Sequence, residues 1–205
     1  MNAIIQVLES TMAAQDPYTV GHQQRVTPIC VAIAEEMGLG EKRINNLTMA
    51  ARLHDFGKIS LPASILSKPG RLSVQEMALI KTHPSVGAEM LKPLKLPTST
   101  FLTIMQHHER MNGTGYPFAL SGEDILLEAR ILAVADVVEA ISSHRPYRPS
   151  LGIENALDEL SRNRGSLYDP MVVDAFVRQN SRSMRDSFFI PKVDFYNTSL
   201  TQRAA

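Results

Sequence analysis

The residues best suited to chemistry lie in one short run, His54-Asp55-Phe56-Gly57-Lys58, where an apolar helix pattern ends. Neighbouring residues on a helix point about 100° apart. The imidazole of His54 and the carboxylate of Asp55 would therefore not pair with each other, but they could bind a common metal ion. Taken alone, the run is equally compatible with a solvated helix end whose His and Lys oppose the helix dipole.

Other candidate ligands recur at helix ends and on inward helix faces along the chain. The chain has six histidines, and five of them fall at such positions. With two aspartates they form a set of seven nitrogen and carboxylate ligands: His22, His54, His83, His107, His108, Asp55 and Asp136. This set suits iron, manganese, nickel or zinc and not calcium, which takes oxygen ligands. The recurrence favours metal binding over the core role that a lone His22 would have.

A single ion would not need seven protein ligands. If Asp55 bridged two ions, each ion would have four protein ligands, and octahedral ions would keep positions for water and substrate. One such division places His22, His54, Asp55 and Asp136 at one ion and Asp55, His83, His107 and His108 at the other.

The composition excludes several classes of function. The 205 residues carry a net charge of zero with a pI near 7, so no global field attracts a long nucleic acid or an anionic membrane. The single cysteine, Cys30, excludes an internal disulfide and a thiolate zinc site. No apolar run approaches the roughly 20 residues of a membrane span, and no signal-peptide pattern is present. We therefore expect a soluble, cytoplasmic protein.

The apolar spacing predicts helices throughout, so the expected fold class is all-α. The expected helices are 1–14, 17–37, 44–53, 73–83, one starting at Pro84, one ending near Glu109, 126–141, 153–163 and 170–179. The residues expected on the inner side of the first helix are Ile4, Ile5, Val7, Leu8 and Met12. Residues 59–70 contain two prolines and a glycine and are expected to form a surface loop. Gly57 is expected to let the backbone leave the helical path.

One carboxylate stands inside the most apolar segment. Residues 126–141 are apolar nearly all round, which predicts a buried helix, and Asp136 lies within it. Burying an unpaired carboxylate costs several kcal/mol. No lysine or arginine lies one turn away on that helix, so the partner must be a metal or a residue from elsewhere.

Two loops could meet a ligand. Residues 112–117 contain two glycines and a proline and cannot be helical, and their backbone amides are free to face a ligand. Residues 145–149 place Arg145 and Arg148 beside prolines, which suits bidentate recognition of guanine or phosphate. The alternative for these arginines is a solvated surface.

With these motifs the chain resembles the HD-GYP family of cyclic di-GMP phosphodiesterases, a branch of the HD metal-dependent phosphohydrolase superfamily. The resemblance runs from about Asp16 to Phe176. The matching residues are Asp16-Pro17-Tyr18-Thr19 with His22, His54-Asp55 with Gly57-Lys58, Ile65-Leu66 with Lys68-Pro69-Gly70, His83, His107-His108-Glu109-Arg110, Gly115-Tyr116-Pro117, Asp136, and Arg145-Pro146-Tyr147-Arg148.

The resemblance implies a single all-α bundle with a binuclear metal centre in its core. It implies hydrolysis of cyclic di-GMP to pGpG, to GMP, or to both, with two divalent transition ions, iron or manganese first and nickel or zinc as alternatives. Asp55 would bridge the ions, and Lys58 would contact a phosphate oxygen. The residues expected to contact the substrate are Arg145, Arg148, Tyr116 and Gly115.

Two positions depart from the family pattern. Members that bind a third metal carry a glutamate four residues before the first histidine, where this chain has Tyr18, so two ions are expected. The loop before Gly113 usually reads Trp-Asp, and here it reads Met111-Asn112. That difference bears on loop rigidity and partner contacts.

Two other functions compete with this hypothesis. One is a catalytically weak cyclic-dinucleotide receptor of the same fold. The other is an HD hydrolase of nucleoside phosphates. It is disfavoured because such enzymes lack the loop at 112–117 and the arginine-proline loop at 145–149.

The expected organisation is an N-terminal helix (1–15) that could link to a sensor or receiver region, an HD-GYP domain (16–180) and a mobile tail (181–205). A protein partner at Gly113–Pro117 and a homodimer are further hypotheses, whereas a long nucleic acid is not expected.

Overall fold

The computed structural model describes residues 2–144 and 149–185, and this part of the chain is all-α, without a β-strand. Its helices are α1 (Asn2–Gln15), α2 (Pro17–Glu36), α3 (Glu41–Leu53), α4 (Ala63–Leu66), α5 (Val74–Ile80), α6 (His83–Leu91), α7 (Thr98–Gln106), α8 (Leu127–Ser142), α9 (Ile153–Arg162) and α10 (Pro170–Arg185). Three short 3-10 helices join them, η1 (Phe56–Ser60), η2 (Lys92–Leu94) and η3 (Gly122–Asp124). Across the described ranges, no helix has both the length and the apolar character that crossing a membrane requires.

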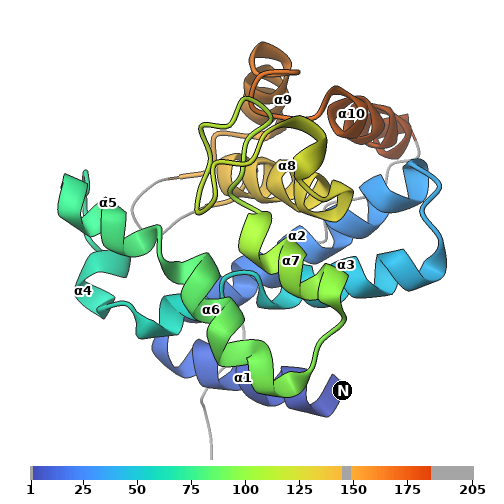
Figure 1. Cartoon of the computed structure of the whole chain (residues 1–205). Coiled ribbons are helices and arrows are strands. Elements are labelled where there is room, and N and C mark those ends of the chain that lie inside the picture. The colour runs from blue at the N-terminus through green and yellow to red at the C-terminus, as the bar shows by residue number, and fades with distance from the viewer. Residues whose placement is uncertain (1, 145–148, 186–205) are drawn as a thin grey trace, which may run out of the picture.

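The core consists of two apolar clusters that share helices α2 and α3. Around Val26 and Leu47, these helices pack with α8, α9 and α10. Around Val20 and Leu53, they pack with α1, η1, α6 and α7. On α2, His22 falls between Val20 of one cluster and Val26 of the other. Figure 1 shows α8 above and α1 below the pair α2 and α3. The predicted site therefore lies where the two clusters meet.

Local sequence signals set most helix starts as expected. The side chain of Asp16 accepts a hydrogen bond from the backbone N–H of Thr19, and Pro17 is the first residue of α2. Ser73 and Glu76 form the predicted capping box of α5. Gly38, with φ of 72°, directly follows the Met37 cap that ends α2. These predictions are confirmed.

Several predicted boundaries are wrong. Residues 59–70 are not all loop, because Pro62 precedes a helical turn, α4, where a missing N–H costs nothing. The helix from Ser73 ends at Ile80, and α6 begins at His83. Helix α7 ends at Gln106, short of the expected 109, and α10 runs beyond 179 to Arg185. Helices α4 and α5 contain no buried residue, and Figure 1 shows them standing to one side of the bundle.

Helix α1 buries a narrower stripe than predicted. Ile5 and Met12 are buried and Leu8 is partly buried. Ile4 and Val7 are instead 47% and 64% exposed. Because α1 packs on α2, α3 and η1 with one side only, residues about a third of a turn away remain outside the contact.

Gly57 has a different role from the one predicted. It lies inside η1, and its φ is not positive. A Cβ at this position would come within 2.0 Å of the carbonyl oxygen of His83 and 2.6 Å of the amide nitrogen of Gly87. A Cβ on Gly87 would likewise lie 2.8 Å from the amide nitrogen of Gly57. The two glycines thus let η1 and α6 pack backbone to backbone, which brings His83 beside Asp55.

We predict that Gly57→Ala lowers the free energy of unfolding by about 1–3 kcal/mol, because the new methyl group overlaps the α6 backbone. Denaturant unfolding followed by circular dichroism would measure this. Gly21→Ala is the matched control, since its Cβ meets only the flexible guanidinium of Arg25 at 3.2 Å and alanine favours a helix interior. A Gly57→Ala protein as stable as wild type would contradict the backbone contact.

Candidate metal centre

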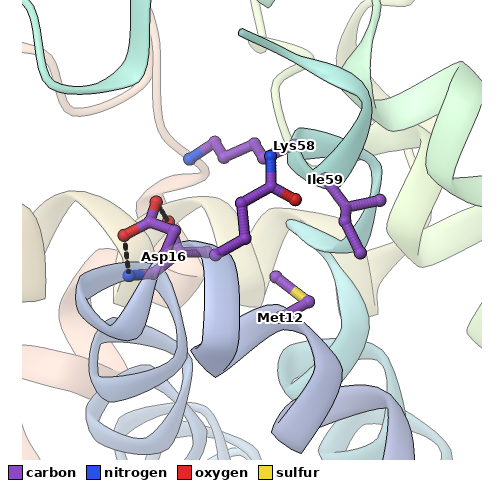
Figure 2. Close-up of a pocket in the computed structure, with 6 residues that line it drawn as sticks. Met12, Asp16, Lys58 and Ile59 are labelled. Atoms are coloured by element: carbon purple, nitrogen blue, oxygen red, sulfur yellow. Dashed lines mark hydrogen bonds between the residues drawn. The ribbon is translucent and has the colours of Figure 1, made fainter. Parts of the chain in front are cut away.

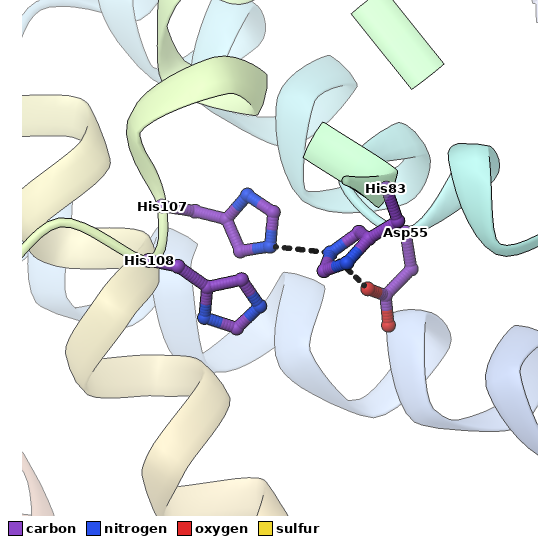
Figure 3. A group of neighbouring side chains, drawn as sticks. All are labelled: Asp55, His83, His107 and His108. Carbon is purple, nitrogen blue, oxygen red and sulfur yellow. Dashed lines mark hydrogen bonds and ion pairs between the residues drawn. The ribbon is translucent and has the colours of Figure 1, made fainter. Parts of the chain in front are cut away.

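The structure brings all seven predicted ligands together in two adjacent groups. Asp55, His83, His107 and His108 form one group, and His22, His54 and Asp136 form the other. Within each group the candidate ligand atoms lie within 4.8 Å of one another. Figure 3 shows the carboxylate of Asp55, the imidazole of His83 and the adjacent imidazoles of His107 and His108, which come from three segments of the chain. The histidines and Asp136 divide as the sequence suggested, whereas Asp55, which was expected in both groups, belongs to the first group only.

The carboxylate of Asp55 lies between the two groups. Its Oδ1 is 3.2 Å from Nε2 of His83 in the first group. Its Oδ2 is 3.5 Å from Nε2 of His54 and 3.9 Å from Nε2 of His22 in the second. Each oxygen therefore faces a different group, which is the geometry that a bridging carboxylate requires.

Backbone carbonyls orient three of the imidazoles in the same way. The Nδ1 atoms of His54, His83 and His107 lie 2.8, 2.8 and 2.7 Å from the carbonyl oxygens three residues earlier. An N–H at Nδ1 donates to the carbonyl, so the neutral ring presents the lone pair of Nε2. Each histidine stands at a helix end or start, so the local turn itself aims Nε2 inward.

These orientations direct electron pairs at one another. Nε2 of His83 is 3.3 Å from Nε2 of His107 and 3.2 Å from Oδ1 of Asp55. Within the described residues, the buried Nε2 of His54 has no hydrogen-bond partner. Acceptor atoms that face one another without a donor between them repel. A cation bound among these atoms would relieve the repulsion and would give the unpaired Nε2 of His54 a partner. The residues present therefore fit a divalent metal ion, and nitrogen with carboxylate oxygen is a transition-metal donor set.

Glu139 is a functional candidate that the sequence reasoning missed. Its side chain is buried and contacts Nδ1 of His22 through Oε2, and its Oε1 accepts a hydrogen bond of 2.6 Å from Nε of Arg25. His22 Nε2 in turn lies 3.0 Å from Oδ1 of Asp136, which supplies the partner expected for that carboxylate. Glu139 follows Asp136 by three residues on a nearly apolar helix, and that spacing was the available signal.

The electrostatics keep both central carboxylates ionised. Burial opposes the charge of Asp55, but the favourable contacts around it, the ammonium of Lys58 first among them, outweigh burial and hold the pKa well below its usual range. Burial likewise opposes the charge of Asp136, and the hydrogen bond to His22 holds its pKa well below the usual range. The carboxylates of Asp55 and Asp136 are thereby both available as anionic ligands.

The histidines differ in their protonation. Burial holds the pKa values of His54, His107 and His108 below the usual range, so these rings are neutral near pH 7. Burial also lowers the pKa of His22, but hydrogen bonds to Asp136 and Glu139 outweigh it and raise the pKa to about 9. Without a metal ion, His22 therefore keeps a proton at neutral pH.

Lys58 lies at the edge of the two groups. Its Nζ is 2.7 Å from Oδ2 of Asp55, and the side chain is 24% exposed. Figure 2 shows Lys58 and Ile59 of η1 facing Met12 and Asp16 across a small cavity beside α1 and α2. The ammonium group thus touches the central carboxylate, and the side chain that carries it is partly exposed to solvent.

The loop residues predicted to contact substrate are placed unequally. The ring of Tyr116 stacks on the imidazole of His108, with centroids 4.7 Å apart and planes at 30°. Gly115 packs against the backbone of Glu109, where a Cβ would lie 2.4 Å from Cα. Arg145 and Arg148 lie outside the described residues.

Residues 6–172 match the HD domain family. The cyclic di-GMP phosphodiesterase response regulator RpfG of Xanthomonas campestris pv. campestris (strain 8004) is 43% identical over 169 residues, 80% of this chain and 44% of that protein. The 3′3′-cGAMP-specific phosphodiesterase 2 of Vibrio cholerae serotype O1 is 36% identical over 169 residues, 82% of this chain and 32% of the relative. The chain spans less than half the length of either relative.

A solved structure shares the fold. Bd1817 from Bdellovibrio bacteriovorus, described as an HDG"Y"P protein, superposes with a TM-score of 0.67 over 87% of this chain and 60% of that chain. Its sequence identity is 21%, so the likeness concerns the architecture alone.

The raised pKa of His22 predicts pH-dependent metal binding. An ion bound to His22, His54 and Asp136 must displace the proton on His22, so its affinity should rise about tenfold per pH unit from neutral pH to about 9. Calorimetric titration with Mn²⁺ in buffers of different ionisation enthalpy would count the released proton.

The other group provides an internal control, because its His107 and His108 are already neutral near pH 7. Glu139→Gln should lower the pKa of His22 and move the proton release to lower pH. Mn²⁺ affinity that is flat with pH for both ions would contradict the assignment.

Proposed function

The chain belongs to the HD domain family, and from that premise we propose that it is a metal-dependent phosphodiesterase of the HD-GYP branch. Its proposed reaction is hydrolysis of cyclic di-GMP to linear pGpG, to GMP, or to both. The observation that carries the proposal is the placement of Asp55, whose two oxygens face two separate groups of nitrogen and carboxylate ligands. Such a pair of sites suits in-line displacement at a phosphodiester.

In this proposal the seven ligands hold two divalent transition ions, iron or manganese first and nickel or zinc as alternatives. When bound, such ions neutralise phosphate charge and lower the pKa of a coordinated water. Tyr18, in place of the glutamate of three-metal members, supports two ions and not three. The carbonyl-anchored imidazoles fix the ligand directions before any ion enters, which limits the reorganisation that binding requires.

Hydrolysis adds water across one P–O bond of the ring. The water oxygen bonds to phosphorus, the bond to a ribose 3′ oxygen breaks, and that oxygen takes up a proton. Lys58 is placed to exchange its contact with Asp55 for a nonbridging phosphate oxygen, because its side chain is partly exposed at the edge of the site. An ammonium group there stabilises charge that grows in the transition state.

The named relatives support a cyclic dinucleotide as the substrate class, since one is a cyclic di-GMP phosphodiesterase and another is specific for 3′3′-cGAMP. The test is to incubate protein loaded anaerobically with Fe²⁺ or Mn²⁺ with each dinucleotide and to separate the products by chromatography. Conversion of cyclic di-GMP to pGpG or GMP is expected. A metal-loaded protein that binds the dinucleotide without turnover would instead be a receptor.

We predict that Asp55→Asn loses at least one ion and lowers kcat/KM for cyclic di-GMP at least about a hundredfold, since the amide carries no charge to bridge two cations. Metal analysis and product chromatography would measure both effects. The helical fold should survive, because a neutral amide removes a buried charge.

Asp158→Asn is the matched control, since Asp158 is exposed on α9 and pairs with Arg162 on the surface. A metal-replete and active Asp55→Asn protein would remove the bridge from the mechanism.

Lys58→Ala should behave differently from Asp55→Asn. Because its proposed contact is to the phosphate, the variant should keep both ions and lose about 100- to 1,000-fold in kcat. Loss of the ions together with the rate would show that Lys58 supports the metal ligands instead.

A further inference from the structure

We infer that Tyr116 is a positioning residue that fixes the imidazole of His108 as a metal ligand. The inference rests on the proposed metal binding and changes the role of Tyr116 from a substrate contact to a support of the centre.

Four of the five histidines are oriented through a ring nitrogen. His54, His83 and His107 use backbone carbonyls, and His22 uses the carboxylate of Glu139. Among the described residues, the imidazole of His108 makes no such hydrogen bond. It is also less buried than the other three ligands of its group. His108 therefore has the greatest freedom to rotate and needs another kind of support.

Ring stacking supplies that support. The Tyr116 ring lies 4.7 Å from the His108 ring, at 30° between planes, whereas His107 and His108 are tilted by 42° at 4.0 Å. The ammonium of Lys81 lies 5.3 Å from the Tyr116 centroid. Stacked rings restrict each other's rotation while leaving both nitrogens of the imidazole free, so stacking can orient a ligand without occupying its nitrogen.

The surrounding loop is built to hold Tyr116 in this place. The buried carboxylate of Glu109 accepts hydrogen bonds of 2.7 and 3.0 Å from the backbone N–H groups of Phe118 and Leu120. The N–H of Tyr116 donates to the carbonyl of His108 at 3.3 Å.

Gly115 makes the fold-back possible. A Cβ there would lie 2.6 Å from the carbonyl oxygen of His108 and 2.5 Å from the amide nitrogen of Arg110. Glycine permits this approach, tyrosine supplies the ring, and Glu109 anchors the segment that follows.

The test compares Tyr116→Leu with Tyr116→Phe. Leucine removes the ring face and should weaken one of the two ions about 10- to 100-fold, whereas phenylalanine keeps the face and should retain wild-type affinity. Chelator competition with Mn²⁺ or Co²⁺ would measure affinity, and the visible spectrum of bound Co²⁺ would report the coordination. Phe118→Leu is the matched control, because that aromatic side chain of the same loop is 51% exposed.

A double-mutant cycle separates positioning from general loop damage. His108→Ala should weaken the same ion, and Tyr116→Leu should add little further loss in that background, because both changes remove one ligand. If the losses in metal affinity of the two single variants add in full in the double variant, the inference is overturned. Circular dichroism checks folding, and Tyr116→Ala replaces Tyr116→Leu if the latter does not fold.

The remaining outcomes are distinct. Wild-type protein that takes up no ion would overturn the proposed function together with this inference. Wild-type uptake with unchanged affinity in Tyr116→Leu would overturn this inference alone. Metal loss in Tyr116→Phe would overturn the stacking role and assign the support of the metal site to the hydroxyl group. A raised KM in Tyr116→Phe, together with normal metal binding in Tyr116→Leu, would assign Tyr116 to substrate contact instead.

Discussion

The ionised carboxylate of Asp55 is buried at the junction of the two apolar clusters, and such a charge requires compensation. Lys58 supplies one contact at 2.7 Å, and imidazoles approach both oxygens. The helices are arranged to meet this requirement. Helix α3 ends at Leu53, directly before His54, η1 follows Asp55, and α6 begins at His83. Five of the seven ligands therefore come from the ends of elements, where a turn can aim a side chain inward while the apolar faces pack. The other two, His22 and Asp136, lie within α2 and α8.

Close backbone packing makes this arrangement rigid. Gly57 and Gly87 allow η1 and α6 to touch, so Asp55 and His83 are held by backbone rather than by long side chains. Close backbone packing at a glycine is found again at Gly115, which lets the 112–117 loop fold against residues 108–110. In both places a glycine brings a polar side chain against the centre. We read the glycines as part of the site's construction, although they contribute no ligand atom.

The ligands are supported in three chemically different ways. Three imidazoles use local carbonyls, His22 uses the distant carboxylate of Glu139, and His108 stacks on Tyr116. These supports have different consequences. A carbonyl fixes a neutral ring, whereas two carboxylates around His22 favour its protonated form. The two groups of the centre thus differ in the charge around their imidazoles although their donor atoms are similar.

Local patterns along the chain predicted the all-α class, the starts of α2 and α5 and the resemblance to the HD-GYP branch, and these predictions are confirmed. The sequence also named the seven candidate ligands, because residue type and position at a helix end or on an apolar helix face are local properties. Only the tertiary structure decided which oxygen of Asp55 faces which group, that Glu139 supports His22, that Tyr116 stacks on His108 and why Gly57 must be glycine. Each of these depends on how separate segments fold against one another, and helix periodicity and capping carry no information about such distances.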